Sequence, residues 1–361
     1  METICPICFA KFNPRRIGIT CSGCGENTMY SKLKRGLFSG GSTFRCPSCG
    51  RFLSDFECPV CGRSVPISTL DCEPVFFSII GARGSGKSHY IAQIVKTLRR
   101  VSRGKFEFLP ADKFTQEIYH QKYESDLFEK LRPLPATNRW INAQEIPRPL
   151  IYTLSFKNFF RTKKCMLVIY DAAGEDLQNA DVNMLRNGYP YIGQSSGIIL
   201  LVDPLSMPMI RNSQLMEEYF NRVGNELLSS YSAGQILKKI RTILGSKCKT
   251  IPLAITFSKI DAVRKFFGEE ASIFISPNCN PFDKTRQMQI NSDIVKWLER
   301  YQGKDNILAE GRHFKKHSYF GVSALGDSLS RSNDGLHLNA SPVPFGVEGP
   351  LLYLLKERHY L

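Results

Sequence analysis

The run "VFFSIIGARGSGKSHYIAQIVKTL" constrains the fold of this chain more than any other segment. It opens with an apolar stretch of strand length, Val75 to Ile80, and after the glycines apolar residues recur at helical spacing. Between the two lies Gly-x-x-x-x-Gly-Lys-Ser, whose glycines let backbone N–H groups surround phosphate oxygens at the start of a helix. The segment therefore predicts a strand, a phosphate-binding loop and a helix in succession.

Each polar position of this loop has an expected role. Lys87 would reach the β- and γ-phosphates and assist hydrolysis, and Ser88 would offer its hydroxyl to magnesium. Arg83 either stabilises charge during hydrolysis, in cis or across a dimer, or points to solvent, and His89 opens the helix. The nucleotide-binding residues predicted here are Gly81, Arg83, Gly84, Ser85, Gly86, Lys87, Ser88 and His89.

Further buried strands end in polar residues. The first is "CMLVIYDAAGEDL", where Asp171 follows the apolar run and is expected to hold magnesium through water. Its Asp-x-x-Gly sequel ends at Gly174, the position whose amide contacts the γ-phosphate in switch GTPases. The next three are "GIILLVDP", "IPLAITFSKID" and "YFGVSALG".

Taken in order, these strand ends resemble the motif set of the TRAFAC-type P-loop GTPases, over about residues 75 to 358. More narrowly, "GARGSGKS", "YDAAGED" and "GVEGPLLYLL" behind an N-terminal zinc ribbon resemble the bacterial double-GTPase family. The resemblance implies a doubly wound, mainly parallel α/β sheet that binds GTP or GDP with magnesium. It also implies that Lys259 lies along the base, that Asp261 pairs with guanine, and that the base is met by Ser323, Ala324 and Leu325.

The chain departs from the family pattern at several points. Ser258 replaces the commoner Asn or Thr, which predicts a looser tie to the phosphate loop. The interval from Lys87 to Asp171 is long and contains a predicted helix, residues 111–131, followed by the switch-one candidate Thr137, a magnesium and γ-phosphate ligand. A second long helical segment is predicted over about residues 211–244. Glu175 stands where many GTPases have a water-positioning Gln, with a catalytic or a structural role.

Eight of the twelve cysteines form four Cys-x-x-Cys pairs near the N-terminus. Such paired spacing predicts two structural four-sulfur zinc sites, because each pair aims two thiolates at one point. An interleaved arrangement is an alternative, but the 21 residues between Cys24 and Cys46 favour two consecutive ribbons, residues 1–72, before a GTPase domain, residues 73–361. The predicted zinc ligands are Cys5, Cys8, Cys21, Cys24, Cys46, Cys49, Cys58 and Cys61.

Charge and hydropathy bound the remaining alternatives. The formal net charge is +15, and two four-thiolate zinc sites would reduce it to about +11. This charge suits any anionic partner, including nucleic acid bound through the basic surface or the ribbons. No apolar run is long enough to span a bilayer and no secretory signal opens the chain, so a cytoplasmic protein is expected.

These features predict a GTP-binding switch with slow or partner-activated hydrolysis, which the family resemblance places in a bacterial conflict or defence system with other proteins of that system. Two alternatives stay open: an ATP-dependent assembly factor, and a zinc-ribbon nucleic-acid-binding protein with a regulatory nucleotide site.

Overall fold

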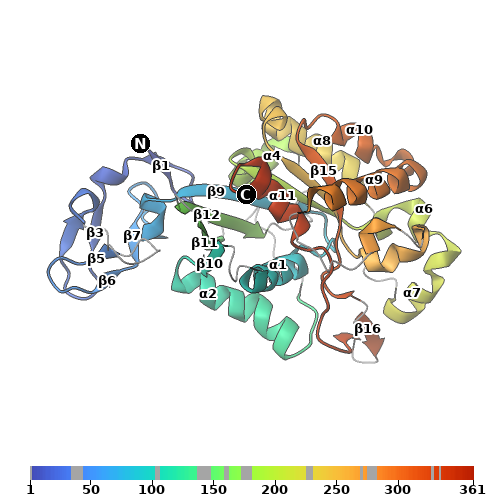
Figure 1. Ribbon diagram of the computed structural model, residues 1–361, viewed down its shortest axis with the longest axis horizontal. Coiled ribbons are helices and arrows are strands. Elements are labelled where there is room, and N and C mark those ends of the chain that lie inside the picture. Colours follow the sequence, from blue (N-terminus) through green and yellow to red (C-terminus); the bar gives the residue numbers. More distant parts are fainter. Residues whose placement is uncertain are drawn as a thin grey trace. The chain divides into compact units, whose positions relative to one another are not determined.

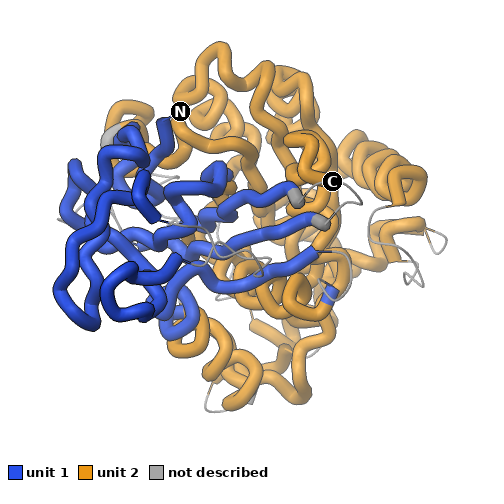
Figure 2. The backbone as a smooth tube through the Cα atoms, turned by 60° about the vertical axis from the view of Figure 1, so that its left-hand side comes forward, with its two compact units in different colours: residues 1–76, 101–118, 144–170 blue, residues 77–100, 119–143, 171–361 orange. Residues whose placement is uncertain are grey.

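A computed structural model describes most of the chain: residues 2–33, 44–101, 106–135, 148–157, 162–171, 181–224, 231–268, 271–274, 283–326, 329–332 and 335–361. The chain forms two compact units (Figure 2). Unit 1 comprises residues 1–76, 101–118 and 144–170, and unit 2 comprises residues 77–100, 119–143 and 171–361. Unit 1 therefore takes in the cysteine-rich segment together with strands from the middle of the chain. The boundary at residues 72 and 73 stays a prediction.

A seven-stranded sheet runs through the fold with the order β10-β11-β12-β9-β13-β14-β15. Its strands are β9 (Glu73–Gly81), β10 (Phe106–Pro110), β11 (Leu150–Lys157), β12 (Thr162–Asp171), β13 (Gly197–Val202), β14 (Leu253–Phe257) and β15 (His317–Gly321). The pairs β9/β13, β13/β14 and β14/β15 are parallel, and every residue of β13 and β14 is buried. Continuous apolar runs are typical of such doubly covered parallel strands. The predicted mainly parallel α/β fold is confirmed.

Helices of unit 2 lie between successive parallel strands along the chain, and α11 follows the last strand (Figure 1). The helix α11 packs on β13 and β14, and α9 packs on β15. The helices are α1 (Lys87–Val101), a π-helix η4 (His120–Glu129), α4 (Val182–Gly188), α5 (Pro190–Gly193), α6 (Pro208–Arg211), α7 (Glu217–Val223), α8 (Ala233–Leu244), α9 (Lys284–Tyr301), α10 (Ile307–Gly311) and α11 (Gly349–Glu357). Among the residues described, no helix is long and apolar enough to cross a membrane.

The two predicted helical segments have different outcomes. The helix predicted over residues 111–131 is present over residues 113–129, with α2 (Lys113–Tyr119) continuing into the π-helix η4. The long helical segment predicted over about residues 211–244 is divided into separate helices. The helix α7 ends at Gly224, which has a positive φ of 83°, and α8 begins afresh with Ser232 as its N-cap.

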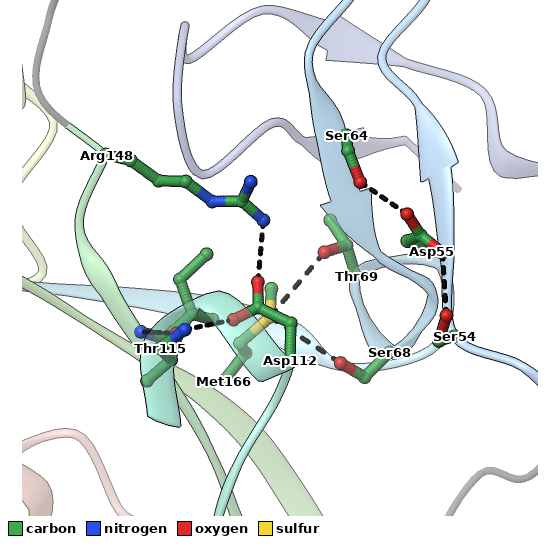
Figure 3. A network of polar contacts seen from close by, with 10 residues as sticks. Ser54, Asp55, Ser64, Ser68, Thr69, Asp112, Thr115, Arg148 and Met166 are labelled. Carbon is green, nitrogen blue, oxygen red and sulfur yellow. Dashed lines mark hydrogen bonds and ion pairs between the residues drawn. The ribbon is translucent and has the colours of Figure 1, made fainter. Parts of the chain in front are cut away.

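In unit 1, β10, β11 and β12 form an antiparallel meander. The start of α2 is fixed by Asp112, whose carboxylate accepts a bond from Thr115 N at 2.7 Å and pairs with Arg148 Nη2 at 2.7 Å (Figure 3). Figure 3 also shows Thr69, from the end of the cysteine-rich segment, whose hydroxyl donates to Met166 Sδ of β12 at 3.6 Å. The cysteine-rich segment and the meander are thus joined by direct contacts.

The cysteine-rich segment is built from four short antiparallel hairpins. Their strands are β1 (Thr3–Ile4), β2 (Lys11–Phe12), β3 (Gly18–Thr20), β4 (Asn27–Met29), β5 (Phe44–Arg45), β6 (Phe52–Leu53), β7 (Asp55–Glu57) and β8 (Ser64–Pro66). They enclose a small core of cysteines and apolar side chains. A fifth two-stranded ladder, β16 (Leu329–Ser332) with β17 (Gly335–Leu338), belongs to unit 2.

Candidate functional site

The carboxyl ends of the four parallel strands lie in register at one edge of the sheet. Gly81, Leu201, Thr256 and Phe320 occupy equivalent positions of β9, β13, β14 and β15. The segment that follows each strand is therefore brought to the same edge. These segments are the phosphate loop, the turn at Asp203, the Ser-Lys-x-Asp box (residues 258–261) and the Ser-Ala-Leu box (residues 323–325). Ligands of open α/β sheets bind at this edge.

The glycines of the phosphate loop are required by its backbone. Gly84 and Gly86 have positive φ values of 76° and 80°, which side chains with a Cβ rarely adopt. At Gly81 a Cβ would lie 2.5 Å from Leu201 O and from Ser85 Oγ. Ser85 Oγ itself is buried and makes no hydrogen bond to any residue described. A buried hydroxyl without a protein partner in a loop of this sequence fits a phosphate oxygen.

The Lys87 side chain is hydrogen-bonded to the backbone of the phosphate loop. Its Nζ donates to Gly81 O at 3.0 Å and to Ala82 O at 2.9 Å, and its side chain is buried. Burial lowers the pKa of Lys87 to about 8, although the negative charge of Asp171 opposes the shift. A bound phosphate would place a compensating negative charge beside the buried Lys87 ammonium.

The predicted magnesium residues Ser88 and Asp171 are brought together. Ser88 Oγ donates to Asp171 Oδ2 at 3.2 Å. A hydroxyl beside a carboxylate is the oxygen donor set that P-loop proteins use for this cation, Ser88 directly and Asp171 through water. When bound, magnesium would neutralise part of the phosphate charge. The third predicted ligand, Thr137, lies outside the residues described, as do Gly174 and Glu175.

Two residues that the sequence analysis did not single out also reach Asp171. Lys122 Nζ and Tyr123 OH each donate to Asp171 Oδ2 at 3.1 Å. Both come from the π-helix η4, in the interval that the sequence analysis treated only as an enlarged helical insertion. No local pattern marks them, because the contact spans 49 and 48 residues of sequence.

His89 contacts the chain just before the switch-one candidate. Its Nε2 accepts a hydrogen bond from Leu134 N at 3.0 Å. Burial, together with the positive charge of Lys259, lowers the pKa of His89 to about 4, with Asp171 opposing the shift. The imidazole is therefore neutral near pH 7, as an accepting nitrogen requires. Direct contact of His89 with nucleotide stays a prediction.

The Lys-x-Asp box is held by an acid from the neighbouring strand. Lys259 Nζ pairs with Asp203 Oδ2 at 2.6 Å, and the Asp203 side chain is only 2% exposed. Asp203 Oδ1 accepts a hydrogen bond from Leu205 N at 3.0 Å, and Asp203 N donates a hydrogen bond to Tyr231 OH at 2.7 Å. No role was predicted for Asp203 from the sequence, although an acid after a buried apolar strand is the same signal that identified Asp171.

Lys259 adopts a left-handed backbone, with φ of 50° and ψ of 33°, which is uncommon for a lysine and typical of functional sites. Asp261 lies in the first turn of the 3₁₀ helix η8 (Ile260–Phe266). Ser258 Oγ donates to Val202 O at 3.3 Å. A Cβ added at Gly86 would lie 3.9 Å from Ser258 Cβ, so Ser258 lies beside the phosphate loop.

The residue directly before the Ser-Ala-Leu box is hydrogen-bonded to the Lys-x-Asp box and to the strand before it. Ile260 N donates to Val322 O at 3.2 Å, and Val322 N donates to Phe257 O at 2.8 Å. Ser323 Oγ accepts from Gly326 N at 2.9 Å, which shapes the turn that carries Ala324 and Leu325. The two boxes expected to meet the base thus form one connected surface. Arg83 is exposed at the rim of the phosphate loop.

The eight paired cysteines form two groups of four, as predicted, but the predicted consecutive pairing is wrong. One group contains Cys5, Cys8, Cys58 and Cys61, and the other contains Cys21, Cys24, Cys46 and Cys49. The first pair therefore joins the fourth, and the second joins the third, which is a nested arrangement. Hairpin packing decides it: the Phe12 and Phe56 rings meet at 5.9 Å, and Thr3 Oγ1 donates to Thr69 O at 2.9 Å.

The sulfur positions fit zinc. Tetrahedral zinc with bonds of about 2.3 Å requires sulfur–sulfur edges of about 3.8 Å. The Cys8–Cys58 distance is 3.8 Å, and the Cys21–Cys49 distance is 3.6 Å. Backbone N–H groups, that of Gly23 foremost, lower the pKa of Cys21 to about 6, which favours the thiolate.

The turns after three of the four cysteine pairs contain a glycine with a positive φ. Gly25, Gly50 and Gly62 all have positive φ values. In the first pair Phe9 occupies this position, with φ of 62°. Its ring packs against Phe76 and Tyr170 at 5.4 and 5.8 Å, and Tyr170 OH donates to Pro6 O. This hairpin is thereby fastened to the sheet strands of unit 1.

Comparisons with known proteins agree with this geometry. A family model described as Double-GTPase 2 matches residues 75–332. The chain is 25% identical over 301 residues to a Mycolicibacterium smegmatis protein described as "Putative ESX-1 scaffolding and assembly protein SaeC", with 78% of this chain and 74% of that protein covered.

Two solved structures are similar at low identity. The S. cerevisiae Ski7 GTPase-like domain bound to GTP is 15% identical with a TM-score of 0.30, covering 80% of this chain and 50% of that one. The cytosolic domain of the T. maritima FeoB iron transporter in a GDP form is 11% identical with a TM-score of 0.22, covering 54% and 48%. This chain thus spans about half the length of both.

Proposed function

The chain belongs to the Double-GTPase 2 family of GTP-binding proteins, and from this premise we propose that it is a molecular switch that alternates between GTP and GDP with magnesium. One observation carries the proposal: Val322, directly before the Ser-Ala-Leu box, is hydrogen-bonded to Ile260 of the Lys-x-Asp box at the sheet edge that holds the phosphate loop. The base-reading and phosphate-binding surfaces are therefore continuous. A guanine base set against Asp261 would direct its phosphates toward Lys87.

The proposed reaction is slow or partner-activated hydrolysis of the terminal phosphate. Lys87 and the loop amides would bind the β- and γ-phosphates, and Ser88 and Asp171 would hold magnesium. Thr137, Gly174 and Glu175 remain the candidates for closing the site and orienting water. An activating residue from a partner would account for a switch function, because such residues raise rates by about 10³ to 10⁵ in related chemistry.

The proposed partners are proteins. The M. smegmatis relative is described as a scaffolding and assembly protein, and a nucleotide switch suits a role in which the GTP state selects one binding partner. The conflict or defence setting stays a prediction from the family resemblance. The two zinc sites would keep the N-terminal segment folded, because about 70 residues supply too little core for stability without metal.

Base selectivity tests the proposal. Asp261 would accept bonds from guanine N1–H and the exocyclic amine, whereas adenine offers neither donor. A site built around such bonds rejects the analogue that lacks them by on the order of 10⁴-fold. We expect GTP and GDP to bind far more tightly than ATP, and we expect Asp261→Asn to lose GTP and gain xanthosine triphosphate. Isothermal titration of the purified protein measures these affinities.

Lys87→Ala is the matched control, since it should abolish binding of all nucleotides without unfolding the chain. Equal affinity of the wild type for ATP and GTP would favour the ATP-dependent assembly factor instead. Salt-dependent binding of RNA or DNA that disappears on removal of zinc would favour the nucleic-acid alternative.

A further inference from the structure

Three donors converge on one carboxylate oxygen at the expected magnesium site. Asp171 Oδ2 accepts from Ser88 Oγ at 3.2 Å, from Tyr123 OH at 3.1 Å and from Lys122 Nζ at 3.1 Å. Ser88 is accounted for by the phosphate-loop motif. Lys122 brings a full positive charge to the place where a magnesium ion and its water shell would take up the same carboxylate.

The helix that carries Lys122 is firmly supported. Tyr119 OH, at its start, donates to Ala92 O of α1 at 2.8 Å, and Tyr123 and Leu127 are fully buried. Farther along, Lys96 of α1 lies 3.6 Å from the centre of the Phe128 ring. The helix η4 is therefore fixed against the helix that begins at the phosphate loop, and a rigid element is what positions a functional side chain accurately.

Lys122 and Tyr123 are adjacent residues of the π-helix η4. Residues His120–Glu129 form a π-helix, a rare geometry that is frequent at functional sites. Here the two adjacent side chains reach the same oxygen, and Lys122 Nζ also lies 5.1 Å from the centre of the Tyr123 ring.

Lys122 can change partners, unlike its neighbour. Its side chain is 45% exposed and is joined to the site through a flexible four-carbon stem, whereas Tyr123 is buried. Magnesium and its water shell at Asp171 would compete with Lys122 for the same carboxylate charge, which would weaken the ion pair between Asp171 and Lys122. The anions closest to that ion are the terminal phosphates, because magnesium bridges the β- and γ-oxygens in P-loop proteins.

We propose that Lys122 is a terminal-phosphate ligand, which pairs with Asp171 in the nucleotide-free protein and moves to the γ-phosphate when magnesium and GTP bind. The proposal rests on the GTP binding proposed above. It assigns to η4 a second phosphate-binding cation, supplied by the same chain and additional to Lys87. Lys122 thereby distinguishes the triphosphate from the diphosphate.

The test compares GTP and GDP affinities of the full chain. Fluorescent GDP and a fluorescent non-hydrolysable GTP analogue are titrated, with magnesium, into the wild type, Lys122→Ala and Lys122→Arg. Lys130→Ala is the matched control, because Lys130 lies just after the same helix and makes an exposed ion pair with Asp126 at 2.8 Å. Thermal unfolding checks that each variant is folded.

We expect Lys122→Ala to weaken the GTP analogue about tenfold or more, as for loss of a charge-assisted hydrogen bond, with GDP affinity unchanged or higher. Lys122→Arg should recover most of the loss, and Lys130→Ala should bind both nucleotides as the wild type does. Equal losses for GDP and the GTP analogue, or no loss for either, would overturn the role of Lys122 while leaving GTP binding intact. A wild type that binds neither nucleotide would overturn the proposed function itself.

Discussion

The ion pair between Asp203 and Lys259 gives the sharpest energetic prediction. Its 2.6 Å length is matched by the pair between Lys265 and Glu218, but the surroundings differ. Asp203 is 2% exposed and Lys259 24%, whereas Lys265 and Glu218 are 59% and 83% exposed. Comparing these two ion pairs of equal length therefore tests how burial changes the contribution of an ion pair to stability.

Asp203→Asn keeps a side-chain oxygen that can accept from Leu205 N. It replaces the carboxylate oxygen that pairs with Lys259 by a neutral amide nitrogen. Breaking a buried pair costs about 3–5 kcal/mol. Because Lys259 is partly exposed, water recovers some of this cost, so we expect a loss of about 2–3 kcal/mol in the free energy of unfolding, or a Tm lower by about 5 °C. Glu218→Gln should cost less than about 1 kcal/mol, since exposed pairs contribute little.

Denaturant unfolding measures both losses, and a double-mutant cycle with Lys259→Met isolates the coupling between the two residues. Asp203→Asn should also weaken GTP binding about tenfold, because Lys259 is no longer held at the base-reading box. A loss of stability no larger than that of Glu218→Gln, together with unchanged GTP affinity, would refute the reasoning.

Two further predictions concern the metal groups and the phosphate loop. Nested pairing predicts that Cys21→Ser with Cys46→Ser leaves about one zinc ion per chain by elemental analysis, while Cys5→Ser with Cys21→Ser leaves none; the reverse pattern would support consecutive ribbons. Because burial lowers the pKa of Lys87 to about 8 and phosphate favours its charged form, GDP binding must take up a proton at high pH. GDP affinity should therefore be constant below about pH 7 and fall as pH rises through 8, and a flat profile from pH 7 to 9 in calorimetric titrations would contradict this role.

The sequence alone determined the features that are written locally. The phosphate loop could be predicted because glycine positions such as Gly84 and Gly86 are needed for positive φ whatever the surroundings. The strand ends could be predicted because buried strands are continuous apolar runs: Asp171 ends one such run, and the Ser-Lys-x-Asp box that contains Asp261 directly follows another. The eight paired cysteines could be predicted as candidate zinc ligands because a Cys-x-x-Cys turn is complete within four residues.

The tertiary structure decided which cysteine hairpins share a site and which distant side chains contact each other. Each cysteine hairpin is equally able to pair with any other, and the nested arrangement follows from packing such as that of Phe12 on Phe56. The contacts of Lys122 with Asp171 and of Lys259 with Asp203 join residues 49 and 56 positions apart. Periodicity and turn chemistry describe neighbours along the chain, so they carry no record of such partners; these are chosen by the free energy of burying and pairing side chains when the sheet assembles.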